Sequence, residues 1–406
     1  MLIQFSVENY LSIKNKVVLS LLASNDTEHQ EHLISFGRKG NYLKSAVIYG
    51  ANASGKSNVL NAFWFVVNYV LTSHEKQLNK RTGRIPFKFD RMTPEQPSSF
   101  ELIFTVHGIR YAYGFSATDT EITEEYLYFY PNGRQALIFE RKNANQYRFT
   151  VDVELQNTLK ERNSHNKLYL STAANWNYDK VKPVFKWFAS CAVITRNSIS
   201  DAYGLDAEQL RDETYRAAIA SMLRVADFGI QSLSIREMDG SPAAAVMIPS
   251  KADTYANIDA VHVVQDKNGN QIPYTLNMTE ESDGTNSYFK LVGVVKEILD
   301  QGSLLVADEM DAHLHPLLTK HLVSLFNSTE LNPNGAQLIF TSHNTNLLDL
   351  DVFRRDQIWF TEKDEKFAAT DLFSLYDFSI RKDAKVEKGY LIGRYGAIPF
   401  IKEELL

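Results

Sequence analysis

The segment GANASGKS, residues 50–57, constrains the fold of this chain more than any other feature. It follows the apolar, partly β-branched run LKSAVIYG and precedes KSNVLNAFWFVVNYVLTS, whose apolar residues continue long enough for a helix. A glycine, four further residues and then Gly-Lys-Ser, between a strand and a helix, is the pattern in which backbone N–H groups and a helix N-terminus enclose phosphate groups. A tight turn alone would not require lysine and serine at its end.

The polar residues of this segment have expected roles at a bound nucleotide. Lys56 adds positive charge beside the β- and γ-phosphates, and Ser57 places its hydroxyl on Mg²⁺. ATP and Mg²⁺ are therefore the expected cofactors. The candidate cofactor-binding residues in this part of the chain are Gly50, Asn52, Ala53, Ser54, Gly55, Lys56, Ser57 and Asn58.

A second motif, SLLVADE, ends on two consecutive carboxylates. A buried strand of this kind projects Asp308 toward the metal ion and leaves Glu309 to orient the attacking water. His343 follows the next apolar run, AQLIFTS, where an imidazole is expected to reach the γ-phosphate or that water. We therefore expect Ser57 and Asp308 as metal ligands and Glu309 and His343 as catalytic residues. Ordinary carboxylates at a strand end and a structural histidine are the alternatives.

The two motifs lie near opposite ends of the chain, so one site requires both ends to fold together around an insertion. We expect an α/β fold with a mixed or parallel sheet, an antiparallel β arm and an inserted, mostly helical lobe. Residues 1–98 and 270–406 form the expected head, 99–145 the arm and 146–269 the lobe. In the head, TNSYFKLVGVVKEILDQG predicts a helix that stops at Gly302.

Composition narrows the class of protein. The chain has 406 residues, 44% of them hydrophobic, which is enough for a full core, and a net charge of −6 argues against coating nucleic acid by bulk charge. The single cysteine, Cys191, excludes an internal disulfide and is expected to be a buried thiol. The sequence has neither a signal peptide pattern nor an apolar run of membrane-spanning length, so we expect a cytoplasmic protein without membrane contact. His313 and His315 lack a clear third ligand for a metal site.

These motifs carry a resemblance to a known class of ATPase. The first segment IQFSVENYLSIKNKVVLSL, the loop GANASGKSN and the later motifs resemble the ABC-type ATPase heads of RecF, SMC and OLD proteins. More closely, VADEMDAHLHPLLTKHLV, LIFTSHNTNLLD and KGYLIGRYGAIPF resemble bacterial AAA-family ATP-binding proteins often linked to phage-defence and restriction loci.

The resemblance implies a fold, a partner and further site residues. An ABC-type head dimerises on ATP, and a signature helix of one subunit completes the site of the other. ESDGTNSYF occupies the signature's place, so Ser282, Gly284 and Thr285 are candidates for contacting the γ-phosphate in trans, with a solvated turn as the alternative. Of the double glycine in the usual Leu-Ser-Gly-Gly pattern, only Gly284 remains in this segment. The glutamine loop of these proteins is not evident, and IPFKFD, with Phe87, Lys88 and Asp90, lies near its expected place.

Three classes of function follow from the sequence. The leading hypothesis is an ATPase that forms a homodimer or higher homo-oligomer through ATP-bound heads and gates a separate nuclease or toxin in anti-phage defence. The alternatives are a RecF-like repair ATPase acting directly on DNA, which keeps DNA or RNA open as partners, and a nucleotide-sensing scaffold with negligible turnover.

Overall fold

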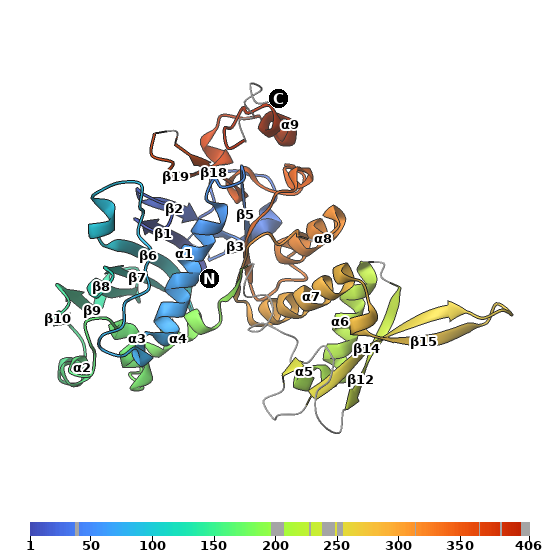
Figure 1. Cartoon of the computed structure of the whole chain (residues 1–406), viewed down its shortest axis with the longest axis horizontal. Helices are drawn as coiled ribbons and strands as arrows, with labels where there is room; N and C mark the ends of the chain where they lie inside the picture. Colours follow the sequence, from blue (N-terminus) through green and yellow to red (C-terminus); the bar gives the residue numbers. More distant parts are fainter. Residues whose placement is uncertain are drawn as a thin grey trace.

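The computed structural model describes residues 1–36, 40–195, 207–226, 229–237, 248–249, 255–312, 314–364, 366–381 and 384–398. Three sheets and the helices that cover them account for most of this part of the chain (Figure 1). The helices are α1 (Lys56–Thr72), α2 (Val153–Lys160), α3 (Tyr169–Asn175), α4 (Lys182–Ala189), α5 (Ala207–Arg211), α6 (Glu213–Val225), α7 (Asp283–Gln301), α8 (Pro316–Asn327) and α9 (Val386–Leu391).

The core sheet carries both sequence motifs. Its strands are β5 (Ser45–Gly50), β11 (Ala192–Ile194), β16 (Leu304–Ala307), β17 (Gln337–Thr341), β18 (Ile358–Lys363) and β19 (Thr370–Ser374). In the order β11-β16-β17-β5-β18-β19, every neighbouring pair is parallel except β18 and β19. The predicted α/β fold with a mixed or parallel sheet is confirmed. Because β5, β16 and β17 are parallel, their carboxyl ends lie at the same edge of the sheet.

A second, antiparallel sheet joins the N-terminus to the predicted arm. Its strands are β1 (Leu2–Glu8), β2 (Val17–Ser20), β6 (Ser98–Val106), β7 (Ile109–Ala117), β8 (Ile122–Tyr130), β9 (Ala136–Lys142) and β10 (Gln146–Phe149). The order is β10-β9-β8-β7-β6-β1-β2, so the arm continues the N-terminal strands as one sheet. A separate pair, β3 (Leu33–Ser35) and β4 (Asn41–Leu43), precedes β5.

Helix α1 lies between these two sheets, and two hydrophobic cores result (Figure 1). Alternate residues of β5 enter different cores: Ala46 and Ile48 pack with α1 and the antiparallel sheet, whereas Val47 and Tyr49 pack with α7 and α8. Cys191 is 1% exposed in this interior, and burial raises the pKa of its thiol to about 12. The prediction of a buried thiol is confirmed.

The inserted lobe differs from the expectation of a mostly helical structure. Beside its helices it contains the strands β12 (Ile230–Glu237), β13 (Ile248–Pro249) and β14 (Tyr255–Gln265), which form a third sheet with β15 (Gln271–Asn277) from the range expected for the head. Strands β14 and β15 form a hairpin that projects from the body (Figure 1). The Asp266 carboxylate closes its turn by accepting hydrogen bonds from the backbone of Asn268 and Asn270, both 2.8 Å. The alternation in YANIDAVHVVQ was the missed signal.

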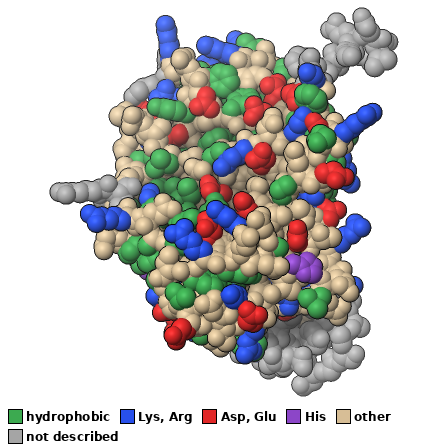
Figure 2. All heavy atoms as spheres, turned by 90° about the vertical axis from the view of Figure 1, so that its left-hand side faces the viewer, with side chains coloured by type: hydrophobic (Ala, Val, Ile, Leu, Met, Phe, Trp, Pro, Cys, Tyr) green, Lys and Arg blue, Asp and Glu red, His purple; other side chains and the backbone are tan. Residues whose placement is uncertain are grey.

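Helices α2, α3 and α4, which also belong to residues 146–269, pack against the antiparallel sheet and α1 rather than with the third sheet. The division into head, arm and lobe stays a proposal. On the face that Figure 2 shows, lysine and arginine side chains are interspersed with acidic and hydrophobic ones. Among the described residues, no helix is both long enough and apolar enough to cross a bilayer.

Candidate functional site

The loop between β5 and α1 has a backbone that only glycine permits at two points. Gly50 has φ 155°, and a Cβ there would lie 2.5 Å from the carbonyl oxygen of Thr361. Gly55 has φ 111°, and its Cβ would lie 2.0 Å from Thr370 Oγ1. Thr361 of β18 and Thr370 of β19 therefore pack closely against the loop, which leads into the N-terminus of α1, a position where backbone N–H groups can bind phosphate.

Lys56 is held at the loop rather than in solvent. Its side chain donates from Nζ to the carbonyl oxygens of Gly50 at 2.7 Å and Ala51 at 3.1 Å, and the residue is 5% exposed. Asn52 and Ala53 form the exposed tip of the loop, where Ala53 has φ 63°. An ammonium group at a loop of this shape fits a nucleotide's phosphates.

Asp308 lies beside Ser57, as the metal-site prediction requires. The Ser57 hydroxyl donates to Asp308 Oδ1 at 3.1 Å, although the two residues come from opposite ends of the chain. Thr341, the last residue of β17, donates its hydroxyl to the same oxygen at 2.7 Å. A hydroxyl and a carboxylate oxygen at this distance are ligand types that Mg²⁺ prefers, so the residues present fit the ion.

Glu309 and His343 lie next to this pair. His343 Nε2 is 3.4 Å from Glu309 Oε1, and the His343 side chain is 44% exposed. The loop that carries His343 is attached to Asp311, whose Oδ2 accepts hydrogen bonds from Ser342 Oγ at 2.9 Å and from the Asn344 backbone N–H at 3.2 Å. The sequence placed Glu309 and His343 at the ends of two strands, and the sheet brings them together.

A chain of hydroxyl groups behind the phosphate loop was not anticipated. Asn58 donates to Ser12 Oγ at 2.7 Å, Ser12 and Thr370 share a hydrogen bond of 2.7 Å, and Thr370 donates to the carbonyl oxygen of Ser54 at 2.8 Å. The Ser54 hydroxyl in turn contacts Thr361 Oγ1 at 2.6 Å. These partners come from the loop after β1 and from β18 and β19, so no local spacing in the sequence could have identified them.

The candidate signature residues lie away from the loop. Ser282 caps α7 by accepting a hydrogen bond from the backbone N–H of Thr285 at 3.1 Å, and Thr285 is 3% exposed. Gly284 lies in the first turn of the same helix. In Figure 1 the start of α7 lies beside α6 and β15, on the side of the molecule away from α1. A contact from Ser282, Gly284 or Thr285 to a γ-phosphate therefore requires a second chain.

The glutamine-loop candidates divide into buried and exposed residues. Phe87 is fully buried, and its backbone N–H donates to Asn9 Oδ1 at 3.0 Å. Lys88 is exposed, and Asp90 forms an ion pair with Lys14 at 2.7 Å. The ion pair ties this segment to the loop after β1, which also carries Ser12.

The structure describes one of the two histidines that were weak metal candidates. His315 caps α8 through a hydrogen bond that its Nδ1 accepts from the Leu317 N–H at 3.3 Å, and His313 lies outside the described residues.

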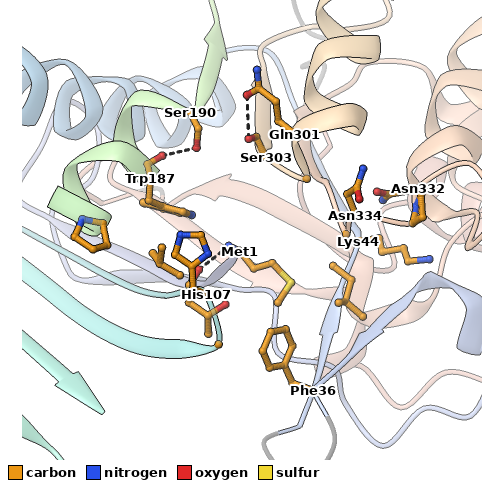
Figure 3. A pocket seen from close by; sticks show the side chains of 18 of the residues that line it. Met1, Phe36, Lys44, His107, Trp187, Ser190, Gln301, Ser303, Asn332 and Asn334 are labelled. Carbon is orange, nitrogen blue, oxygen red and sulfur yellow. Dashed lines mark hydrogen bonds between the residues drawn. The ribbon is translucent and has the colours of Figure 1, made fainter. Parts of the chain in front are cut away.

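A cavity of about 820 Å³ opens at the opposite, amino-terminal edge of the core sheet (Figure 3). In it Trp187 of α4 and Ser190, which follows α4, lie across from Gln301 and Ser303, which precede β16. Lys44 extends into its wall and donates to the carbonyl oxygen of Glu31 at 2.7 Å. Neither Asp308 nor Glu309 lines this cavity, so it is separate from the nucleotide site.

Comparison with known proteins points to one family. The model of the family described as “AAA domain, putative AbiEii toxin, Type IV TA system” matches residues 45–349, which include both motifs and His343. No curated protein matches the chain. Among solved structures, the Smc head domain with an extended coiled coil, bound to the C-terminal domain of ScpA and derived from Pyrococcus furiosus, is 13% identical with a TM-score of 0.40. That comparison covers 97% of this chain and 98% of the other, but the likeness is too weak to assign an activity or a partner.

Proposed function

Because the chain belongs to this AAA-domain family, we propose that it binds ATP with Mg²⁺, hydrolyses the ATP, and uses the cycle to gate a partner effector. One observation carries the proposal: the Ser57 hydroxyl lies 3.1 Å from Asp308 Oδ1, and Glu309 and His343 lie beside them at the carboxyl edge of the core sheet. Ligands are expected at this edge of a parallel sheet.

Each residue has a defined task in this proposal. The loop N–H groups and Lys56 bind the phosphates, and Ser57 and Asp308 hold the metal ion, which when bound neutralises charge on the phosphate oxygens. Glu309 orients the attacking water and accepts its proton, and His343 interacts with the γ-phosphate or with that water. Thr341 positions both carboxylate residues through one hydroxyl.

The chain is further proposed to act as a homodimer of ATP-bound heads, or as a higher homo-oligomer. Ser282, Gly284 and Thr285 of one subunit would then contact the γ-phosphate bound to the other. In Figure 1 the start of α7 lies on the side of the molecule away from α1, so in this proposal the contact is made in trans. The family description names a toxin of a toxin–antitoxin system, which supports a link to a nuclease or toxin effector in anti-phage defence.

The test is the molar mass of the Glu309→Gln variant by light scattering, with and without ATP and Mg²⁺. Glutamine keeps the shape of the side chain but cannot accept the proton, so ATP should remain bound and the dimer should persist. Lys56→Ala, which weakens phosphate binding, is the control and should stay at its nucleotide-free mass. Repeating the measurement with a candidate effector tests the partner.

The outcomes separate the hypotheses. A doubling of mass that needs both ATP and Lys56 supports clamping of two heads. A Glu309→Gln variant that binds ATP but keeps its mass would reject the dimer and favour a nucleotide-sensing scaffold. A RecF-like ATPase predicts ATP-strengthened, salt-dependent DNA binding by the isolated protein. The net charge of −6 argues that any such binding uses a local surface, and on the face shown in Figure 2 the basic side chains are interspersed with acidic ones.

A further inference from the structure

A group of metal-ligand side chains lies away from the nucleotide site, in the segment between β2 and β3. His29, Glu31 and His32, called the HEH cluster below, belong to or flank the short helix η1 (Gln30–His32). Glu31 Oε1 lies 3.1 Å from His29 Nδ1 and 3.6 Å from His32 Nε2. The ligand atoms of all three residues lie within 4.8 Å of one another. Two imidazole nitrogens thus lie beside one carboxylate oxygen.

The position of the proton on a neutral His29 ring follows from the hydrogen bond made by its second ring nitrogen, Nε2. His29 Nε2 lies 2.7 Å from the backbone carbonyl oxygen of Leu350, and a carbonyl can only accept. Nε2 therefore carries the proton. In the neutral ring the lone pair is then on Nδ1, which faces Glu31.

The proton of His32 follows from the orientation of one amide. His32 Nδ1 lies 2.9 Å from Gln357 Oε1, and this oxygen also accepts the backbone N–H of Arg354 at 2.9 Å. The amide nitrogen of Gln357 donates to Ser45 Oγ at 2.8 Å, so its oxygen and nitrogen are assigned by their partners. His32 Nδ1 must therefore donate, which leaves the lone pair of the neutral ring on Nε2, again facing Glu31.

These contacts form the outer shell that protein metal sites use. A ligating histidine donates its second ring nitrogen to a carbonyl or similar acceptor, which fixes the ring and directs the lone pair at the ion. In the absence of a metal ion, two neutral rings would face the Glu31 carboxylate with their lone pairs, so that a proton on one ring has to take the place of the metal ion. The two imidazole rings are stacked, with centroids 4.6 Å apart and an interplanar angle of 12°, so one ring has to turn for both lone pairs to meet a single ion.

The separations agree with one tetrahedral ion. Zinc lies about 2.0–2.2 Å from nitrogen and oxygen ligands, so ligand atoms around it are about 3.3 Å apart. The measured separations from Glu31 Oε1, 3.1 Å and 3.6 Å, lie on either side of that value. A neighbouring cavity of about 340 Å³, lined by Glu31, His32 and Asp351 among others, provides access and space for a further ligand.

We propose that the HEH cluster binds one divalent transition-metal ion, with Zn²⁺ as the best-fitting class. The ion would connect the segment before β3 to two distant parts of the chain, through Leu350 and through Gln357 before β18. Gln357 also contacts Ser45 at the start of β5, whose other end, Gly50, begins the phosphate loop. The site is therefore separate from the Mg²⁺ site and does not depend on the proposed ATPase activity.

The test is a Zn²⁺ titration of the chelator-treated full chain by calorimetry, with Co²⁺ absorption as a report of tetrahedral coordination. His29→Ala and Glu31→Gln are the main variants, because both side chains are partly exposed, and circular dichroism checks their folding. His262→Gln is the matched control, since it alters another histidine–glutamate pair, 2.6 Å apart, with no second imidazole in that pair. His343→Ala identifies any Zn²⁺ bound beside Glu309.

We expect one Zn²⁺ per wild-type chain, with affinity reduced at least about tenfold in His29→Ala and Glu31→Gln and unchanged in His262→Gln and His343→Ala. Zn²⁺ should also raise the melting temperature of the wild type but not of Glu31→Gln. If folded His29→Ala and Glu31→Gln bind Zn²⁺ as the wild type does, or if the wild type binds none, the cluster is a hydrogen-bonded ion pair and the proposal is wrong.

Discussion

Glu309 donates its backbone N–H to the hydroxyl oxygen of Thr341 at 2.7 Å, and the same hydroxyl donates to Asp308 Oδ1 at 2.7 Å. One side chain from β17 thus holds two consecutive residues at the end of β16. Glu309 has φ 50°, a backbone conformation that a non-glycine residue rarely adopts without such support.

Replacing Thr341 with valine should slow ATP hydrolysis more than it weakens ATP binding. Valine keeps the shape but removes both hydrogen bonds, so Asp308 and Glu309 lose their alignment. We expect kcat to fall about tenfold or more, with a smaller change in the ATP dissociation constant. Phosphate release and ATP titrations measure the two. Thr341→Ser, which keeps the hydroxyl, should retain most activity, and equal kcat values for the valine and serine variants would contradict the role.

Gly55→Ala should abolish nucleotide binding. The added Cβ would lie 2.0 Å from Thr370 Oγ1, so the loop or β19 must move, and φ 111° is itself strained for alanine. Gly83→Ala is the control, because Gly83 also has a positive φ, 89°, but nothing lies within 4 Å of its Cβ position. Titration with ATP should show binding in the control alone, and tight binding by Gly55→Ala would disprove the steric argument.

Glu125 is predicted to be a main source of stability in the antiparallel sheet. It is fully buried and accepts the backbone N–H groups of Tyr169 at 2.6 Å and Leu170 at 2.9 Å, with Arg141 3.9 Å away. Glu125→Gln leaves the buried guanidinium without a counter-charge, so the free energy of unfolding should fall by roughly 2–4 kcal/mol. Urea denaturation measures it. The exposed neighbour Glu124, changed to glutamine, should alter stability by less than about 0.5 kcal/mol.

We expect Asp26 to contribute to the acid sensitivity of the fold. Burial alone would raise its pKa, but hydrogen bonds from Arg355 at 2.7 Å and from the Glu28 N–H at 3.2 Å, with the charges of Arg355 and Arg354, hold the pKa below its usual value. Because the folded pKa is the lower one, the contribution is present above the unfolded value of about 3.9 and is lost as pH falls through the folded pKa.

Asp26→Asn should therefore be less stable than the wild type at neutral pH. The difference in stability should shrink as the pH falls toward about 3, because Asp26 takes up its proton in that range. Urea midpoints measured from pH 7 to pH 3 test this. Parallel curves for the two proteins would rule out Asp26 as the titrating group.

Much of the nucleotide loop and its strands could be predicted because those signals are local. Gly50 and Gly55 are required by backbone conformations within a single loop, and Gly302 ends α7 with φ 64°, as predicted from the helix that precedes it. The third sheet was missed although YANIDAVHVVQ alternates, and the pairing of β12 and β13 with β14 is set by tertiary contacts rather than by neighbouring residues.

The sequence by itself determined the strand, loop and helix around Lys56, the apolar strand that ends at Asp308, and the family to which the chain belongs. These follow from the periodicity and chemistry of neighbouring residues. Only the tertiary structure decided that Thr341 supports Asp308 and Glu309, that Thr370 braces the phosphate loop, and that ring nitrogens of His29 and His32 lie beside Glu31. Those relationships join residues from separate strands and loops, and a hydrogen bond between them exists only once the sheets have brought the chain segments together.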